Sequence, residues 1–311
     1  MLRSDPRKPL RRGARRYHWL MASTASWTLR AAGIGLAALA AFGTCAAAPA
    51  VWLVTLMDGE AVVVDGLRRI VAAPGLELGS GALIETGEST ALVRLEGPEQ
   101  SSIDLGPATR VMLSPPAQAS RGGRVPVLYL LQGWAKLTSR TSAGSAGLAG
   151  FAAPGLDGGP VNGALVLRVA AGEQSLFAET ARLDVHERRT GGPVLKLVPG
   201  QFYRGDGNKP GSVTPRPDPA WLKDLPRAFR DTIPLRAASF KDRPATPVVL
   251  PGPSYEQLAQ WLAAEPYVRR DFTQRFAPLL RDPAFRRGVQ QRLNAHPEWA
   301  TVLYPPKDPT R

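Results

Sequence analysis

Cysteine is almost absent from this chain of 311 residues, and the single Cys45 lies within an apolar N-terminal stretch. We expect the rest of the chain to contain neither a disulfide nor a thiol nucleophile. Histidine is nearly as scarce, because after this stretch only His186 and His296 occur, 110 residues apart. No residues have the spacing of zinc ligands, so the sequence predicts no metal site and no cofactor.

Motifs of common enzyme classes are also missing. The sequence has no Gly-x-Ser-x-Gly elbow, no phosphate-binding loop and no Gly-x-Gly-x-x-Gly opening a helix. Paired carboxylates such as Glu85 with Glu88, or Asp184 with Glu187, could hydrolyse a glycoside only across a sugar cleft. On strands and turns we expect them to be solvated. We therefore predict a non-enzymatic protein without catalytic residues, with an envelope carbohydrate hydrolase as the weakest alternative.

The net charge of +13 is unevenly distributed. Residues 1–30 carry +7, residues 31–217 carry +1 and residues 218–311 carry +5. More than half of the excess therefore belongs to the N-terminal arm, and the basic residues lack interleaved aromatics that could stack on bases. The sequence does not favour a nucleic-acid-binding protein.

The basic arm precedes an uncharged stretch from Ala31 to Met57. A charged region followed by an apolar region and small residues is typical of a signal peptide, and we expect cleavage near residues 47–51. An uncleaved inner-membrane anchor facing the periplasm is the alternative, because the stretch is long enough to span a bilayer. Translation could start at Met1 or at Met21, which leaves a more ordinary leader.

Short apolar runs separated by glycines fill residues 51–115. Turns every 8 to 12 residues predict antiparallel strands arranged as a sandwich or a distorted barrel. In the run TALVRLEG, Val93 and Leu95 alternate with Arg94 and Glu96. This alternation predicts a half-buried strand whose second face is partly wet.

The segment DGEAVVVDGLRRIVAAPGLELGSGALIETGESTALVRLEGPEQSSIDLGPATRVMLS resembles the FecR-like periplasmic domain. The resemblance rests on the glycine-bracketed LELGSGALIETG and on IDLGPATRVML, and extends more weakly through LKLVPGQFY to about residue 205. Family members usually have a DGS turn where this chain has residues 97–102, GPEQSS. The resemblance implies a β domain outside the inner membrane that relays receptor occupancy to a sigma factor. A cytoplasmic anti-sigma segment, which that role requires, is missing from the N-terminal arm.

The chain is accordingly divided into four parts. Residues 1–50 are a signal peptide or anchor, 51–205 a FecR-like β domain, 206–253 a Pro-rich linker with a short helix, and 254–311 a helical module. Asp218, Ser254 and Asp282 are predicted helix caps. The seven glycines of residues 140–163 predict a mobile loop or lid that could include one edge strand. The fold class is mainly β, followed by a small α-helical module.

Arginines are concentrated in the helical module. Guanidinium groups bind carboxylates and phosphates bidentately, so the patch could meet an envelope protein or an anionic envelope polymer. A solvated outer face of the module is the alternative. The candidate binding residues are Arg269, Arg270, Arg275, Arg286, Arg287 and Arg292.

These observations predict a periplasmic or cell-envelope module for binding or scaffolding, with envelope signalling as its expected setting. A membrane-anchored regulator of a sigma factor, responding to an outer-membrane receptor, is the main alternative, and it requires an uncleaved leader. Contact with a membrane is expected only in that case. The sequence leaves the ligand and the oligomeric state open.

Overall fold

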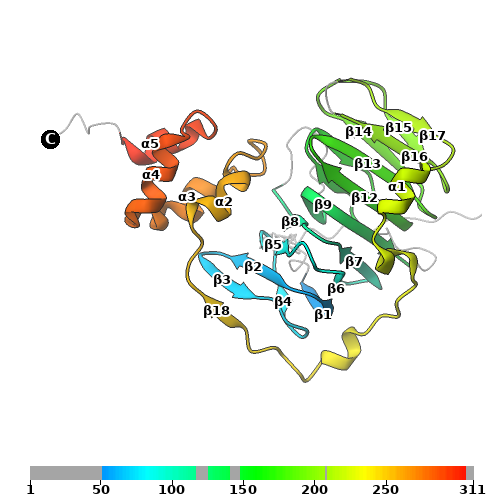
Figure 1. Cartoon of the computed structure of the whole chain (residues 1–311), viewed down its shortest axis with the longest axis horizontal. Helices are drawn as coiled ribbons and strands as arrows, with labels where there is room; N and C mark the ends of the chain where they lie inside the picture. Colours follow the sequence, from blue (N-terminus) through cyan, green and yellow to red (C-terminus); the bar gives the residue numbers. More distant parts are fainter. Residues whose placement is uncertain (1–50, 117–124, 141–147, 207–208, 306–311) are drawn as a thin grey trace, which may run out of the picture. The chain divides into compact units, whose positions relative to one another are not determined.

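The computed structural model describes residues 51–116, 125–140, 148–206 and 209–305. All of them belong to one compact unit. The predicted signal peptide or anchor, with Cys45 and both start codons, lies outside the described residues. The described chain is mainly β, with antiparallel sheets followed by short helices, so the predicted fold class is confirmed (Figure 1).

Within the described residues, eighteen strands divide into two sheets that share one long strand, β9 (Leu128–Ser139). The first sheet has the order β4–β1–β6–β7–β9–β12–β13–β16–β17. Its other strands are β4 (Glu77–Leu78), β1 (Trp52–Asp58), β6 (Leu92–Glu96), β7 (Ser101–Leu105), β12 (Gly163–Ala170), β13 (Glu173–Ala178), β16 (Phe202–Gly205) and β17 (Ser212–Thr214).

The second sheet has the order β18–β3–β2–β5–β8–β9–β10–β11–β14–β15. Among its pairs only β9 with β10 is parallel. Its other strands are β18 (Val248–Leu250), β3 (Arg68–Val71), β2 (Ala61–Asp65), β5 (Leu83–Thr86), β8 (Arg110–Leu113), β10 (Phe151–Ala153), β11 (Leu156–Gly158), β14 (Leu183–Glu187) and β15 (Leu195–Leu197).

Strand β9 changes sheet at Gly133. Residues before it pair with β8, and residues from it onward pair with β7 and β12. Gly133 has φ +94°, and a Cβ there would lie 2.4 Å from the Thr109 Cα. Only glycine fits this bend. The Thr109 hydroxyl accepts the Trp134 amide at 2.9 Å, which replaces the ladder bond lost at the bulge.

The main hydrophobic core is formed by the inward-facing side chains of both sheets. Val93 and Leu95 of β6 are fully buried there, as the alternation predicted. The opposite face of β6 is not wet, however. Arg94 and Glu96 are only 4% and 3% exposed, because a later part of the chain covers them. This corrects the expectation of a partly solvated face.

The helical module packs on the outer face of the second sheet. It comprises α2 (Tyr255–Leu262), α3 (Phe272–Phe276), the 3-10 turn η3 (Ala277–Arg281), α4 (Pro283–Gln291), η4 (Pro297–Trp299) and α5 (Ala300–Leu303). Ser254 forms the predicted capping box with Gln257, and Asp282 caps α4. The apolar helix faces bury Val64, Leu83, Met112, Tyr129 and Ala152 of the sheet.

His296 is fully buried in this module, where its Nε2 lies 3.0 Å from the Tyr255 hydroxyl. Its side chain therefore packs inside the module, against Tyr255. Residues 148–163 differ from the expected loop, because they contain β10 and β11. Both strands gain ladder partners from β9 and β14 that a glycine count does not reveal.

The predicted linker, residues 206–253, contributes several elements to the fold. They are β17, α1 (Pro219–Asp224), η1 (Arg227–Arg230), η2 (Ala237–Phe240) and β18. Asp218 caps α1 as predicted, accepting the Trp221 amide at 2.7 Å. The segment packs Trp221, Leu225 and Phe229 on the outer face of the first sheet and later adds β18 to the edge of β3. Figure 1 shows its course from α1 to β18.

Candidate functional site: a sheet face that holds an extended segment

One row of side chains crosses the outer face of the first sheet. Ladder partners on neighbouring strands share a face, so the strand register defines the row. Its first half is charged and its second half is apolar. In order across β6, β7, β9, β12, β13 and β16, the row is Arg94, Asp104, Lys136, Val166, Phe177 and Phe202.

Arg94 and Asp104 form a bidentate ion pair. The Arg94 Nε and Nη2 donate to the two Asp104 oxygens at 2.6 and 2.7 Å, and both side chains are at most 4% exposed. The remaining Arg94 Nη1 donates to the Ile233 carbonyl at 2.6 Å. We call residues 230–247 the strap. A buried guanidinium is tolerated when each of its nitrogens donates a hydrogen bond, and here the Ile233 carbonyl of the strap accepts the bond that Asp104 does not.

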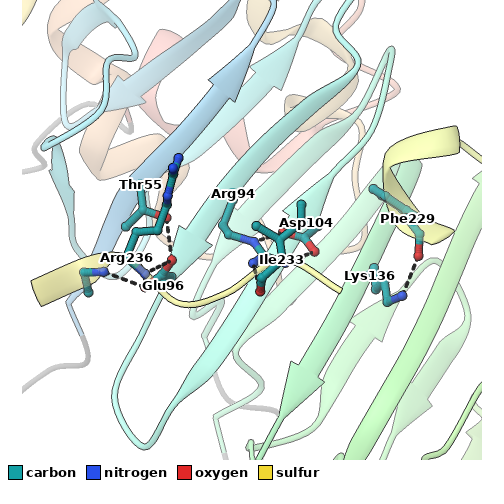
Figure 2. Close-up of polar contacts among 9 residues, drawn as sticks. Thr55, Arg94, Glu96, Asp104, Lys136, Phe229, Ile233 and Arg236 are labelled. Atoms are coloured by element: carbon teal, nitrogen blue, oxygen red, sulfur yellow. Dashed lines mark hydrogen bonds and ion pairs between the residues drawn. The ribbon is translucent and has the colours of Figure 1, made fainter. Parts of the chain in front are cut away.

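Glu96 holds the strap by its backbone amides. Its carboxylate accepts the Arg236 amide at 2.8 and 2.9 Å, the Ala237 amide at 2.8 Å and the Thr55 hydroxyl at 2.8 Å (Figure 2). Thr55 lies at the bulge of β1, which turns it towards Glu96. A carboxylate that accepts two consecutive amides binds a polypeptide regardless of its side chains.

Lys136 contacts the chain just before the strap. Its ammonium group donates to the Phe229 carbonyl and pairs with Glu179 at 2.8 Å. Figure 2 shows Lys136, Arg94 and Glu96 along the same face, each reaching the covering segment. The three charged side chains thus bind backbone groups of the segment at three successive points.

The apolar half of the row receives one large side chain. Trp221 of α1 is buried and donates its indole N–H to Ser175 at 2.8 Å. Its ring lies 5.3 Å from that of Trp134, 5.9 Å from Phe177 and 5.1 Å from Phe202, measured between centroids. Such a tryptophan is a strong anchor because it buries a large apolar area with its polar atom satisfied.

The geometry of this face therefore suits polypeptide binding. An apolar pocket takes an aromatic anchor, and charged side chains then bind carbonyl and amide groups of the extended chain that follows. Sequence reasoning missed the site because Arg94 and Glu96 look like ordinary solvated positions on an alternating strand. The available signal was the recurrence of charges at Arg94, Asp104 and Lys136 within the predicted β domain.

The six candidate arginines of the helical module occupy different environments. Arg270, Arg286, Arg287 and Arg292 are exposed, and Arg292 lies 3.8 Å from Glu256. Arg269 is buried and pairs with Glu298. Arg275 donates to the carbonyls of residues 64, 66 and 81 at 2.9, 3.1 and 2.7 Å. Its burial lowers the pKa of this guanidinium.

Arg275 and Arg269 are thus engaged within the fold, where Arg275 fastens the helices to the second sheet. The exposed arginines form the part of the predicted patch that an external anion could reach. Binding by this patch stays a prediction.

A second charged cluster joins the helical module to β10, β11 and β14. Arg188 pairs with Asp157 and Glu265, and Glu265 also accepts the Tyr129 hydroxyl at 3.1 Å and the Gly155 amide at 3.2 Å. Burial and the Glu265 charge raise the pKa of Tyr129, which therefore stays protonated and donating. A cavity of about 170 Å³ lies beside this cluster, lined in part by Phe151, His186 and Tyr267.

A polar cavity of about 310 Å³ contains the carboxylate pair considered from the sequence. Glu85 and Glu88 line it together with Arg110, Gln132 and Gln260. Burial raises the pKa of Glu85, although Arg110 at 3.3 Å opposes this shift. The two carboxylates therefore share one cavity, with Glu85 already paired to a cation.

Comparisons with known proteins give little similarity. No family model matches this chain, and no curated protein matches it. One similar solved structure is described as a "putative anti-sigma factor" from Parabacteroides distasonis, at 12% identity and a TM-score of 0.34, covering 43% of this chain and 59% of that chain. At this score the likeness carries no argument. Among the described helices, none is both long and apolar enough to cross a membrane.

Proposed function

We propose that this protein is a non-enzymatic binding or scaffolding module of the cell envelope, FecR-like in its β domain and exported to the periplasm. The observation that carries the proposal is the outer face of the first sheet. Arg94, Lys136 and Glu96 there bind an extended polypeptide through its backbone, and the neighbouring apolar half of the face holds Trp221. This is binding machinery, built from buried and fully paired polar groups.

Two sequence features support the location and the family resemblance. The basic arm followed by an uncharged stretch from Ala31 is typical of an export signal. The LELGSGALIETG and IDLGPATRVML segments resemble those of FecR-like domains, and they include β5 and β8. The ligand proposed for the module is a protein of the envelope, and the exposed arginines offer a further surface for an anionic polymer.

The first experiment is to express the full chain with a C-terminal tag in a Gram-negative host and to fractionate the cells. We expect a soluble periplasmic product whose N-terminus, determined by mass, lies near residues 47–51. An uncleaved membrane-bound product would contradict export as a free module and would favour the anchored regulator of a sigma factor.

The arginine patch is tested separately. In an affinity measurement against anionic envelope polymers and envelope extracts, we expect Arg286→Glu combined with Arg287→Glu to weaken binding at least tenfold, because two guanidinium contacts are replaced by repulsion. The control is Arg227→Glu, because Arg227 is also exposed but lies outside the helical module. Unchanged binding to every identified partner would remove the patch from the proposal.

A further inference from the structure

The two outer faces of the sheets are covered in physically different ways. On the second sheet, the helical module buries a continuous apolar cluster that includes Trp261, Phe272, Phe276 and Trp299. The strap on the first sheet contributes no buried side chain of its own. From residue 230 to residue 247 no residue is buried, and Ile233, Ala237, Phe240, Ala245 and Pro247 are the only half-covered ones.

The strap is therefore held by a few polar contacts between two fixed ends. Phe229 is fully buried at one end, and β18 pairs with β3 at the other. Between them, Arg94 binds the Ile233 carbonyl, Glu96 binds the amides of residues 236 and 237, and the Ala245 amide donates to Gly75 at 3.1 Å. A segment with few apolar contacts opens at a lower free energy than the rest of a fold.

The side chains beneath the strap can be exposed to water at a low cost in free energy when the strap detaches. Arg94, Asp104 and Glu96 are charged, so water can solvate them once the strap leaves. The Arg94–Asp104 pair remains intact, because both of its bonds lie within the sheet. Lifting the helices from the second sheet would instead expose Leu83, Met112 and other apolar side chains, which costs far more.

We infer that the strap is a releasable cover and that the charged row beneath it is a docking site for an extended segment of a partner protein. The contacts that now hold the strap define the ligand chemistry. Arg94 takes a carbonyl, and Glu96 takes two consecutive amides that begin three residues later. Because these contacts are made only to backbone atoms, a partner segment of different sequence can replace the strap. The inference rests on the proposed binding function and names its surface.

Thiol labelling measures release of the strap directly. Ser102 is 3% exposed and is the ladder partner of Glu96, so it lies on the covered face. Val93 is fully buried on the opposite, core face. Ser102→Cys and Val93→Cys, each in a Cys45→Ser background, place a single thiol on each face. In the purified protein we expect the Ser102→Cys thiol to react with a maleimide ~100-fold faster, because strap opening precedes global unfolding.

Proline variants of the strap then identify the contact. Ala237→Pro removes an amide that donates to Glu96, and we expect it to speed labelling at Ser102→Cys about tenfold without changing labelling at Val93→Cys. Ala238→Pro is the matched control, since the Ala238 amide is not a Glu96 donor. Equal labelling of both thiols, or equal acceleration of both by Ala237→Pro, would overturn the releasable strap.

Docking is measured with a fluorescent peptide of residues 230–247, the segment known to fit this face. We expect it to bind the Ala237→Pro protein at least tenfold more tightly than the wild type, whose tethered strap competes at high effective concentration. Absence of binding to either protein, or a dimer formed by exchange of the strap, would overturn docking of a partner segment. These results come from purified protein, so their failure leaves the fractionation test of the proposed function intact.

Discussion

The Arg94–Asp104 pair allows a quantitative test of how the first sheet holds its cover. The perturbation is a double-mutant cycle with Arg94→Met, Asp104→Leu and the double variant, which replaces the ion pair by apolar groups. Both charged side chains are at most 4% exposed while the strap is in place, so neither charge is solvated in the closed fold if its partner is removed. Removing one member of such a pair costs about 3–5 kcal/mol.

The structure assigns different costs to the two single variants. After Asp104→Leu, Arg94 keeps only the Ile233 carbonyl, so we expect the loss of stability to lie near the upper end, ~5 kcal/mol. After Arg94→Met, Asp104 still faces its ladder partner Lys136, so we expect ~3 kcal/mol. The double variant leaves no buried charge unpaired and loses chiefly the bond to the strap, which costs about 1–3 kcal/mol.

The assay is urea-induced unfolding of the purified proteins at neutral pH, followed by tryptophan fluorescence. We expect the double variant to be more stable than Asp104→Leu alone, with a coupling free energy of about 3 kcal/mol or more. Additivity of the two single effects within about 0.5 kcal/mol would refute the reasoning, because it would mean that each charge is solvated independently.

Three further predictions concern other parts of the fold. Burial lowers the pKa of His296 below 6.5, so as the pH falls the unfolded chain binds a proton at His296 before the folded chain does, and the free energy of unfolding should decrease below about pH 6.5. In urea unfolding at several pH values, His296→Phe should flatten this dependence on pH. An unchanged dependence would contradict the assignment to His296. Gly133→Ala should lower the free energy of unfolding by roughly 2–3 kcal/mol, because φ is +94° and the new Cβ would collide with Thr109. A change below ~0.5 kcal/mol would show that the bend can relax. Arg275→Met should lower the free energy of unfolding by roughly 2–4 kcal/mol in the same assay, because it removes three hydrogen bonds to backbone carbonyls. The exposed control Arg270→Met should lower it by less than about 0.5 kcal/mol. Equal effects would refute the role of Arg275 in holding the helices to the second sheet.

Much of the local structure could be predicted from sequence neighbours alone. Alternation placed Val93 and Leu95 in the core, and the Ser254 capping box and the Asp282 cap marked the starts of α2 and α4. These features depend on contacts within a few residues, which the sequence displays directly. The class of fold followed from the same kind of evidence, because regularly spaced turns between short apolar runs imply antiparallel strands.

The roles of polar residues could not be predicted in this way. Alternation shows that Arg94 points away from the core, but it does not show what lies above it. The covering carbonyl belongs to Ile233, 139 residues later in a proline-rich segment without apolar periodicity. Likewise, Arg275 and Arg287 look equivalent in the sequence, yet only Arg275 is aimed at carbonyls of the second sheet.

The sequence by itself therefore determined the strand-forming runs of residues 51–115, the inward face of β6 and the helix starts at Asp218, Ser254 and Asp282, because these follow from periodicity and capping. The tertiary structure alone decided that β9 joins the two sheets, that the helices cover one outer face and that the strap covers the other. The two covers depend on contacts between segments more than a hundred residues apart, such as Arg275 with Val64 and Glu96 with Arg236. Buried charges are satisfied only in the assembled fold, so their function is visible only there.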